Sequence, residues 1–194
     1  MHGIVNWLDP QILMIDQFLT PEECESYINY SEYLGYELAD VDFYGVRKQS
    51  NQIRTNERAD IESQELADKL WNELRNYPLP SSELRNPAGL SPFIRFYRYQ
   101  GNQRFNFHKD GFKKYSNYES QFTVLIYLNS IKQGGETIFR KNAIKVQPQS
   151  GRCLLFAHDL WHSGLAVTDE EIKYVMRSDL FYLQNKSFEA ESEN

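Results

Sequence analysis

The sequence lacks the features of membrane and disulfide-stabilised proteins. It contains no apolar run near the ~20 residues that a membrane-spanning helix needs, and its N-terminal segment has no basic stretch before an apolar one. We therefore expect no membrane partner, no signal peptide and a cytoplasmic location. The only 2 cysteines, Cys24 and Cys153, lie far apart and form no CxxC motif, so two reduced thiols are expected.

Internal repeats, low-complexity linkers and an excess of positive charge are also absent. The net charge of -6 argues against duplex nucleic acid as a partner. A length of 194 residues, with 41% hydrophobic and 25% charged residues, is typical of one globular domain. The aromatic residues are numerous and favour a strand-rich core, because rings pack well on pleated surfaces.

The first half of the chain predicts one short strand and two helices. The strand is expected over residues 12–18. Thr20, Pro21 and Glu23 form a capping-box pattern, which predicts a helix that ends near Gly35. Leucines at every fourth position predict a second helix over residues 63–76, and the proline-containing residues 79–92 are expected to form a loop.

From Phe93 onward the sequence favours short strands. They are expected at residues 93–99, 121–129, 144–146, 153–156 and 173–183. The connection between residues 146 and 153 contains Pro148 and Gly151 and is typical of a hairpin. This order predicts a curled antiparallel sheet or barrel, mostly β with flanking helices.

Histidine is scarce, yet three of the 4 histidines fall between Phe107 and Ser163. His108 and Asp110 are two residues apart, which on a strand would place both side chains on one face. With His162 they would supply two imidazoles and one carboxylate, a set that suits non-haem Fe(II). The alternative for His108 and Asp110 is a hydrogen-bonded pair on the surface. Zinc is a less suitable metal for this set, because zinc sites are more often tetrahedral.

His158 precedes His162 by four residues, a spacing seen for zinc ligands on a helix. The preceding residues 153–157 favour a strand, and Asp159 replaces the glutamate of an HExxH motif. We therefore interpret His158 as a hydrogen-bonded neighbour of the site or a loop residue.

Lys173 and Arg177 lie four residues apart on the last predicted strand and therefore share a face. An inward-facing cation needs an anion, so one or both are expected to bind a dicarboxylate. An exposed edge strand with solvated charges is the alternative. Asp179 lies on the same face and could neutralise Arg177.

Several motifs occur together in an order that resembles the Fe(II)/2-oxoglutarate dioxygenases, and within them the prolyl 4-hydroxylase-like group, over residues 92–182. The matching stretches are residues 99–102, 107–110, 125–129, 134–139, 146–151, 162–164 and 173–179. Residues 15–24 are similar to the strand and helix that usually precede this group's catalytic domain.

The resemblance implies a double-stranded β-helix, a jelly-roll or cupin-like core, over residues 93–183. Residues 1–92 would supply an N-terminal strand and buttressing helices of the same domain, and residues 184–194 a flexible acidic tail. The resemblance also implies that the iron is held by His108, Asp110 and His162. The implied 2-oxoglutarate ligands are Lys173, Tyr127 and Tyr99, and Arg177 would either join them or face the substrate.

This chain has one residue more between His162 and Lys173 than the commonest spacing in the prolyl hydroxylases, which leaves the choice between Lys173 and Arg177 open. For Tyr99 and Tyr127 the alternative is packing in an aromatic core.

The resemblance also implies an enzyme that hydroxylates an aliphatic carbon and decarboxylates 2-oxoglutarate to succinate and CO2. Fe(II), 2-oxoglutarate and O2 are the implied cofactors, with ascorbate as a stimulant. A peptidyl proline or another peptide side chain is the leading substrate. The alternatives are a free amino acid or small metabolite, or a cupin-like protein that binds metal and ligand without turnover. The oligomeric state stays open.

Three further features could concern the substrate. Basic residues cluster around the metal motif and indicate either an anionic substrate or a solvated face: Arg95, Arg98, Arg104, Lys109, Lys113 and Lys114. Residues 111–120 would form either a lid hinged at Gly111 or a surface connection. Asn56 and Arg58 would line a substrate groove or belong to a loop.

Overall fold

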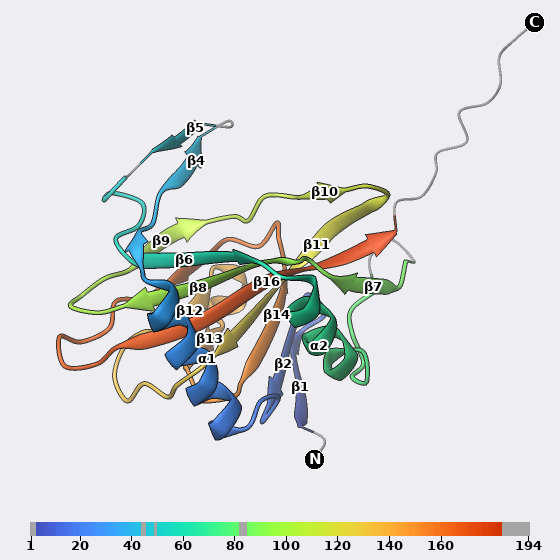
Figure 1. The fold of residues 1–194 in the computed structure, drawn as a ribbon, viewed down its shortest axis with the longest axis horizontal. Helices are drawn as coiled ribbons and strands as arrows, with labels where there is room; N and C mark the ends of the chain where they lie inside the picture. Colours follow the sequence, from blue (N-terminus) through green and yellow to red (C-terminus); the bar gives the residue numbers. More distant parts are fainter. Residues whose placement is uncertain (1–2, 44–45, 49, 82–84, 184–194) are drawn as a thin grey trace, which may run out of the picture.

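Two antiparallel sheets face each other in the computed structural model, and two helices cover the outer face of the larger sheet (Figure 1). The structure describes residues 3–43, 46–48, 50–81 and 85–183. The prediction of a mostly β fold with flanking helices is confirmed. Neither helix in this described part of the chain combines the length and the hydropathy of a membrane span.

The large sheet contains ten strands, and eight of them form a continuous path with the order β1-β2-β14-β11-β16-β8-β6-β3. β10 pairs with β11, and β7 pairs with β16. The bounds are β1 (Ile4–Asp9), β2 (Ile12–Asp16), β3 (Glu37–Leu38), β6 (Glu57–Glu62), β7 (Pro87–Leu90), β8 (Phe93–Tyr99), β10 (Lys114–Tyr115), β11 (Tyr118–Tyr127), β14 (Cys153–Ala157) and β16 (Lys173–Leu183).

The small sheet has the order β13-β12-β15-β9. Its strands are β9 (Phe105–His108), β12 (Thr137–Phe139), β13 (Lys145–Val146) and β15 (His162–Gly164). A separate pair, β4 (Val41–Phe43) and β5 (Val46–Lys48), projects from the body of the molecule near β9 (Figure 1). A short 3-10 helix, η1 (Lys141–Ala143), connects β12 to β13.

Both helices begin where the sequence predicts. In α1 (Pro21–Leu34) the Glu23 amide donates to Thr20 Oγ1 at 3.2 Å, and the Thr20 amide donates to Glu23 Oε2 at 3.1 Å. The helix ends at Gly35, whose φ of 81° is easily adopted only by glycine. α2 (Gln64–Leu74) begins after its N-cap Ser63 and buries two of its three periodic leucines.

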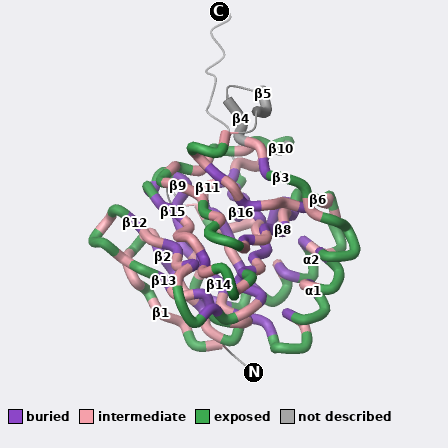
Figure 2. Tube along the Cα trace, turned by 90° about the vertical axis from the view of Figure 1, so that its left-hand side faces the viewer, coloured by how far each residue is buried: buried purple, intermediate pink, exposed green. Residues whose placement is uncertain are grey.

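The two faces of β16 and β8 serve different purposes. Phe96 and Met176 lie opposite each other in register and are buried towards the helices, where the Phe96 ring is 6.1 Å from that of Tyr30. The alternate residues, including Tyr97, Lys173 and Arg177, face the small sheet. Figure 2 shows the buried segments concentrated in the strands between the helices and the small sheet. The interior between the sheets is therefore where the polar side chains of β16 meet the histidines.

Two predictions about connections are wrong. Residues 144–146 and 153–156 do not form a hairpin, because β13 pairs with β12 in the small sheet while β14 pairs with β2 and β11 in the large one. The chain crosses between sheets near Gly151, which has a φ of 76° and whose carbonyl oxygen accepts hydrogen bonds from the Phe18 and Leu19 amides. Residues 79–92 are not all loop, since β7 pairs with the end of β16. Its proline stands at the first strand position, where no ladder bond is lost.

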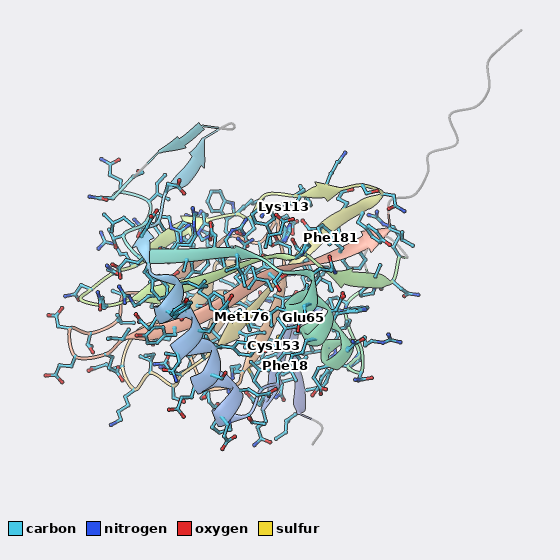
Figure 3. The ribbon with its side chains drawn as sticks, in the orientation of Figure 1. Phe18, Glu65, Lys113, Cys153, Met176 and Phe181 are labelled. Carbon is cyan, nitrogen blue, oxygen red and sulfur yellow. The ribbon has the colours of Figure 1, made fainter. Side chains whose placement is uncertain are left out.

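Two further parts of the large sheet were not predicted from the sequence: β1, which forms a hairpin with β2, and the strands between the two helices. Cys24 and Cys153 are both buried and unpaired, as expected. Figure 3 shows Cys153, Phe18 and Met176 within the body of the molecule, where all three are buried. The predicted tail, residues 184–194, lies outside the described residues.

Candidate metal centre

Three potential metal ligands meet between the two sheets. His108 on β9 and His162 on β15 lie opposite each other in register, and their ring centroids are 4.2 Å apart. Asp110 lies two residues beyond the end of β9, not on the strand as expected, and its amide donates to the His158 carbonyl oxygen at 3.0 Å. One ligand atom from each of the three side chains lies within 4.8 Å of the others.

Backbone carbonyl groups orient both imidazoles. His108 Nδ1 is 2.8 Å from the Asn106 carbonyl oxygen, and His162 Nδ1 is 2.9 Å from that of Leu160. A carbonyl oxygen only accepts, so each Nδ1 carries the proton and each Nε2 keeps its lone pair. The two Nε2 atoms are each 3.7 Å from an oxygen of Asp110. The lone pairs and the carboxylate therefore converge.

The electrostatics keep this set ready to bind a cation. Burial lowers the pKa of His108 to about 3, with His162 contributing, and burial also lowers the pKa of His162. Burial alone would raise the pKa of Asp110, but the Arg177 guanidinium and the imidazoles hold it below its ordinary value. At neutral pH the donors are thus two neutral imidazoles and one carboxylate.

This donor set fits a non-haem Fe(II) ion, which is commonly held on one face by two histidines and one carboxylate. Aromatic rings pack against both ligands: Phe105 stacks on His108 with centroids 3.5 Å apart, and Phe156 lies 4.5 Å from His162. Such packing limits access of water and fixes the rings.

Lys173 faces the centre from β16 across a small cavity. Its side chain is 2% exposed, its Nζ donates to the Gly135 carbonyl oxygen at 2.8 Å, and it lies 4.1 Å from the Tyr99 ring centroid. No ion pair of Lys173 is found among the described residues. Burial lowers its pKa to about 7. The structure therefore places a desolvated amine in the same cavity as the three candidate ligands, with the Glu136 carboxylate near enough to oppose the lowering of its pKa but not in ion-pair contact.

Arg177 lies on the same face of β16 but has other partners. Its Nη2 is 3.2 Å from Asp110 Oδ2, 3.0 Å from Asp179 Oδ1 and 3.2 Å from Thr123 Oγ1. The expectation that Asp179 neutralises Arg177 is confirmed by this contact. The Arg177 guanidinium is therefore already paired with the candidate ligand Asp110 and with Asp179.

Of the two tyrosines implied to bind 2-oxoglutarate, one lines the cavity and the other is engaged by a neighbouring side chain. Tyr99 lines the cavity, and no hydrogen bond of its hydroxyl is found in the described part of the chain. Tyr127 is fully buried and does not line the cavity, because its hydroxyl donates to Thr137 Oγ1 at 2.7 Å. Thr137, which the sequence analysis missed, lines the cavity in its place.

His158 stands outside the three-ligand cluster. Its ring is buried, and its Nε2 lies 3.6 Å from Asp179 Oδ1. It follows β14 directly, and its backbone holds Asp110 in place. His158 is therefore a buried neighbour of the centre that follows a strand, but neither ring nitrogen has a hydrogen-bond partner among the described residues, so the expected hydrogen-bonded side chain is not found.

A wide groove adjoins the centre on the side of Arg177. Arg58 lines it, whereas Asn56 is fully buried and accepts a hydrogen bond from the Arg54 Nε at 3.0 Å. Within the predicted lid, residues 111–120, the structure contains the two-residue strand β10 paired with the start of β11. Arg54 also lines the groove. It was not predicted from the sequence, because it lies far from the metal motif in the chain.

Comparison with known proteins gives a family match. Residues 94–178 match the model of the 2OG-Fe(II) oxygenase superfamily. A probable prolyl 4-hydroxylase of Arabidopsis thaliana is 26% identical over 142 residues, which cover 70% of this chain and 47% of that protein. The chain spans less than half the length of the curated relatives it matches.

Solved prolyl hydroxylases share the fold. One, from Trichoplax adhaerens and in complex with a hypoxia inducible factor peptide fragment, has a TM-score of 0.68 at 19% identity, covering 89% of this chain and 84% of that chain. A Pseudomonas putida prolyl-4-hydroxylase has a TM-score of 0.64 at 14% identity, covering 95% and 94%. The resemblance stated from the sequence, and the jelly-roll core that it implies, are confirmed.

Proposed function

We propose that this protein is a 2-oxoglutarate-dependent dioxygenase that hydroxylates an aliphatic carbon, since residues 94–178 match the model of the 2OG-Fe(II) oxygenase superfamily. A peptidyl proline is the leading substrate. The observation that carries the proposal is the convergence of two neutral imidazoles and one carboxylate opposite a buried lysine. Residues 93–183 would form the catalytic core, supported by residues 1–92.

In this proposal His108, Asp110 and His162 hold the iron. When bound, Fe(II) and 2-oxoglutarate supply the oxidising chemistry, in which O2 is consumed, 2-oxoglutarate becomes succinate and CO2, and the substrate gains a hydroxyl group. The protein orients these groups and excludes water around them. Ascorbate would act as a stimulant. The buried thiols Cys24 and Cys153 support a reducing compartment, and we propose the cytoplasm.

Lys173 is the proposed anchor for the far carboxylate of 2-oxoglutarate. Its amine lies in the cavity that the three ligands also line, and its contact there is the neutral carbonyl of Gly135. Arg177 is already engaged by Asp110 and Asp179, which favours Lys173 over Arg177 for this role. A dicarboxylate would supply the charged partner that Lys173 lacks.

An anaerobic titration tests the proposal most directly. Adding Fe(II) and then 2-oxoglutarate to the purified protein should produce the charge-transfer absorption of the chelate, and neither component alone should do so. Proline-containing peptides should then gain one oxygen by mass spectrometry while succinate is released. Absence of the chelate absorption with both components present would exclude this function.

The tyrosines give a finer prediction. We expect Tyr99→Phe to raise the Michaelis constant for 2-oxoglutarate about threefold to tenfold, because its hydroxyl lies free at the cavity. Tyr127→Phe should leave that constant within about twofold and lower the free energy of unfolding by ~1 kcal/mol, since it breaks a buried hydrogen bond to Thr137. Steady-state kinetics and urea unfolding of both variants measure this. The reverse order of the two Michaelis constants would show that Tyr127 is the contact residue.

A further inference from the structure

The groove beside the metal centre is rich in cations although the protein is acidic. Its volume is about 1040 Å³, and it adjoins His108, Asp110 and Arg177. Six cationic side chains line it against two anionic ones, Asp40 and Asp110, whereas the whole chain has a net charge of -6. The six are Arg54, Arg58, Arg95, Lys109, Lys113 and Arg177.

Three of these cations already have carboxylate partners. Arg58 is 2.8 Å from Asp40 Oδ1 and also pairs with Asp60. Arg177 pairs with Asp110 and Asp179 as described above, and Lys113 Nζ lies 3.5 Å from Asp179 Oδ2. Figure 3 shows Lys113 at the edge of the molecule that carries β10. These pairs account for both anionic side chains of the groove, and no ion pair of Arg54, Arg95 or Lys109 is found within the described ranges.

Among the remaining cations, Arg54 is the one that is buried with an unpartnered donor. It is 6% exposed, and its Nη2 is buried without a hydrogen-bond partner among the described residues. Its guanidinium lies over the Phe105 and Tyr97 rings, at 4.2 Å and 5.0 Å from their centroids. A buried donor without a partner is costly, which indicates that an acceptor from outside the chain completes this site.

Arg95 stands next to Arg177 across the β8–β16 ladder. Neither an ion pair nor a hydrogen bond of its guanidinium is found in the described part of the structure. Arg177, Arg95 and Arg54 together lower the pKa of the buried Tyr97 phenol to about 8, although burial opposes this. The potential at this point of the groove is therefore positive and favours an anion.

The size and rim of the groove indicate the kind of anion. The volume of the groove lies slightly above the ~300–1,000 Å³ typical of small-molecule sites, and a free amino acid would leave most of it empty. Exposed aromatic residues line it: Phe107, Phe112 and Trp161 are 37%, 58% and 43% exposed. Rings that flank a polar groove are typical of surfaces that bind peptides.

We propose that this groove binds an acidic peptide segment, and that Arg54 and Arg95 receive a carboxylate that flanks the hydroxylated residue. The inference rests on the proposed function for the position of the reacting residue. Binding of the peptide does not depend on the proposed function, because the groove and its cations are present without iron.

The test measures peptide binding to the metal-free protein. Fluorescein-labelled peptides with a central proline and glutamates on both sides are compared by anisotropy with otherwise identical peptides that carry glutamine. We expect the glutamate peptide to bind at least about tenfold tighter at low salt, with the difference shrinking as salt rises. Equal affinities for the two peptides would overturn the inference.

Matched arginine variants locate the contact. Arg95→Gln should reduce the preference for glutamate about tenfold, whereas Arg104→Gln, which removes an exposed cation outside the groove, should leave it unchanged. Arg54→Gln serves as a second variant once circular dichroism shows that it folds. If Arg95→Gln and Arg104→Gln lost the preference for the glutamate peptide equally, the preference would depend only on the overall charge of the protein. That result would contradict the assignment.

Two further arms separate the outcomes. Free glutamate or proline that displaces the labelled peptide at equal molar concentration would identify a small carboxylate as the ligand and overturn the peptide assignment. The chelate absorption with Fe(II) and 2-oxoglutarate is recorded on the same preparation. A normal chelate without glutamate preference contradicts the inference alone, whereas glutamate preference without a chelate contradicts the proposed function alone.

Discussion

Replacing Lys173 with methionine is expected to weaken 2-oxoglutarate binding about 10- to 100-fold and to stabilise the ligand-free protein. Binding weakens because a buried carboxylate would lose a charged donor worth ~1.5–3 kcal/mol. Stability rises because the fully buried amine lacks a carboxylate partner among the described residues, and methionine fills a similar space without that desolvation cost. Anaerobic titration of 2-oxoglutarate and urea unfolding of the same variant measure the two effects.

The pH dependence of stability provides an independent readout. The pKa of Lys173 is about 7 in the folded protein, against an ordinary value of 10.5. Between these values the unfolded chain binds more protons, so Lys173 makes the folded state more stable as pH rises, by at most about 1.4 kcal/mol per pH unit. Well below pH 7 the amine is protonated in both the folded and the unfolded state. The contribution of Lys173 to the free energy of unfolding then no longer changes with pH and has its lowest value. Lys173→Met should lack this rise.

Lys145→Met is the matched control, since Lys145 is exposed on β13. It should change neither 2-oxoglutarate binding nor the slope of stability with pH. If Lys173→Met bound 2-oxoglutarate normally, Arg177 would become the candidate anchor despite its two carboxylate partners.

Replacing His162 with glutamine is expected to lower the affinity for Fe(II) by more than about 100-fold, and turnover with it. Losing a partner outside the coordination shell already costs ~10- to 100-fold in metal affinity, so loss of a ligand should cost more. Asp110→Asn should behave similarly, because it removes the only carboxylate of the cluster. Iron per chain after desalting, together with the chelate absorption, measures the loss.

His158→Gln is the control within the same short segment. Its imidazole is as buried as that of His162 but faces Asp179 and not the cluster. This variant should retain one iron per chain even if it is less stable. Retention of iron by His162→Gln and its loss in His158→Gln would mean that the ligand set proposed here is incorrect.

Local signals in the sequence predicted the parts of the fold that depend on neighbouring residues. The capping box at Thr20 and Glu23 is such a signal, because all of its hydrogen bonds form within four residues. The face shared by Lys173 and Arg177 follows equally from strand periodicity. These features need no knowledge of the rest of the chain.

Features that depend on distant partners could not be predicted in this way. Gly151 carries an ordinary turn signal, but only the amides of Phe18 and Leu19 make the turn a crossing between sheets. Asp110 lies beyond its strand because the His158 carbonyl oxygen binds its amide. Arg54 joins the groove through Phe105 and Tyr97, on β9 and β8. No pattern near these residues indicates such contacts.

The continuous strand β16 carries Lys173 and Arg177 four residues apart on one face, a separation of ~13 Å at the usual rise per residue. The region proposed for the co-substrate and the groove proposed for the peptide are thus attached to one rigid element. An insertion or deletion of one residue between them would reverse the face of one cation and disable one of the two regions. Divergence towards new substrates is therefore expected to proceed by substitution along this strand, and length changes should be confined to the loops around the groove.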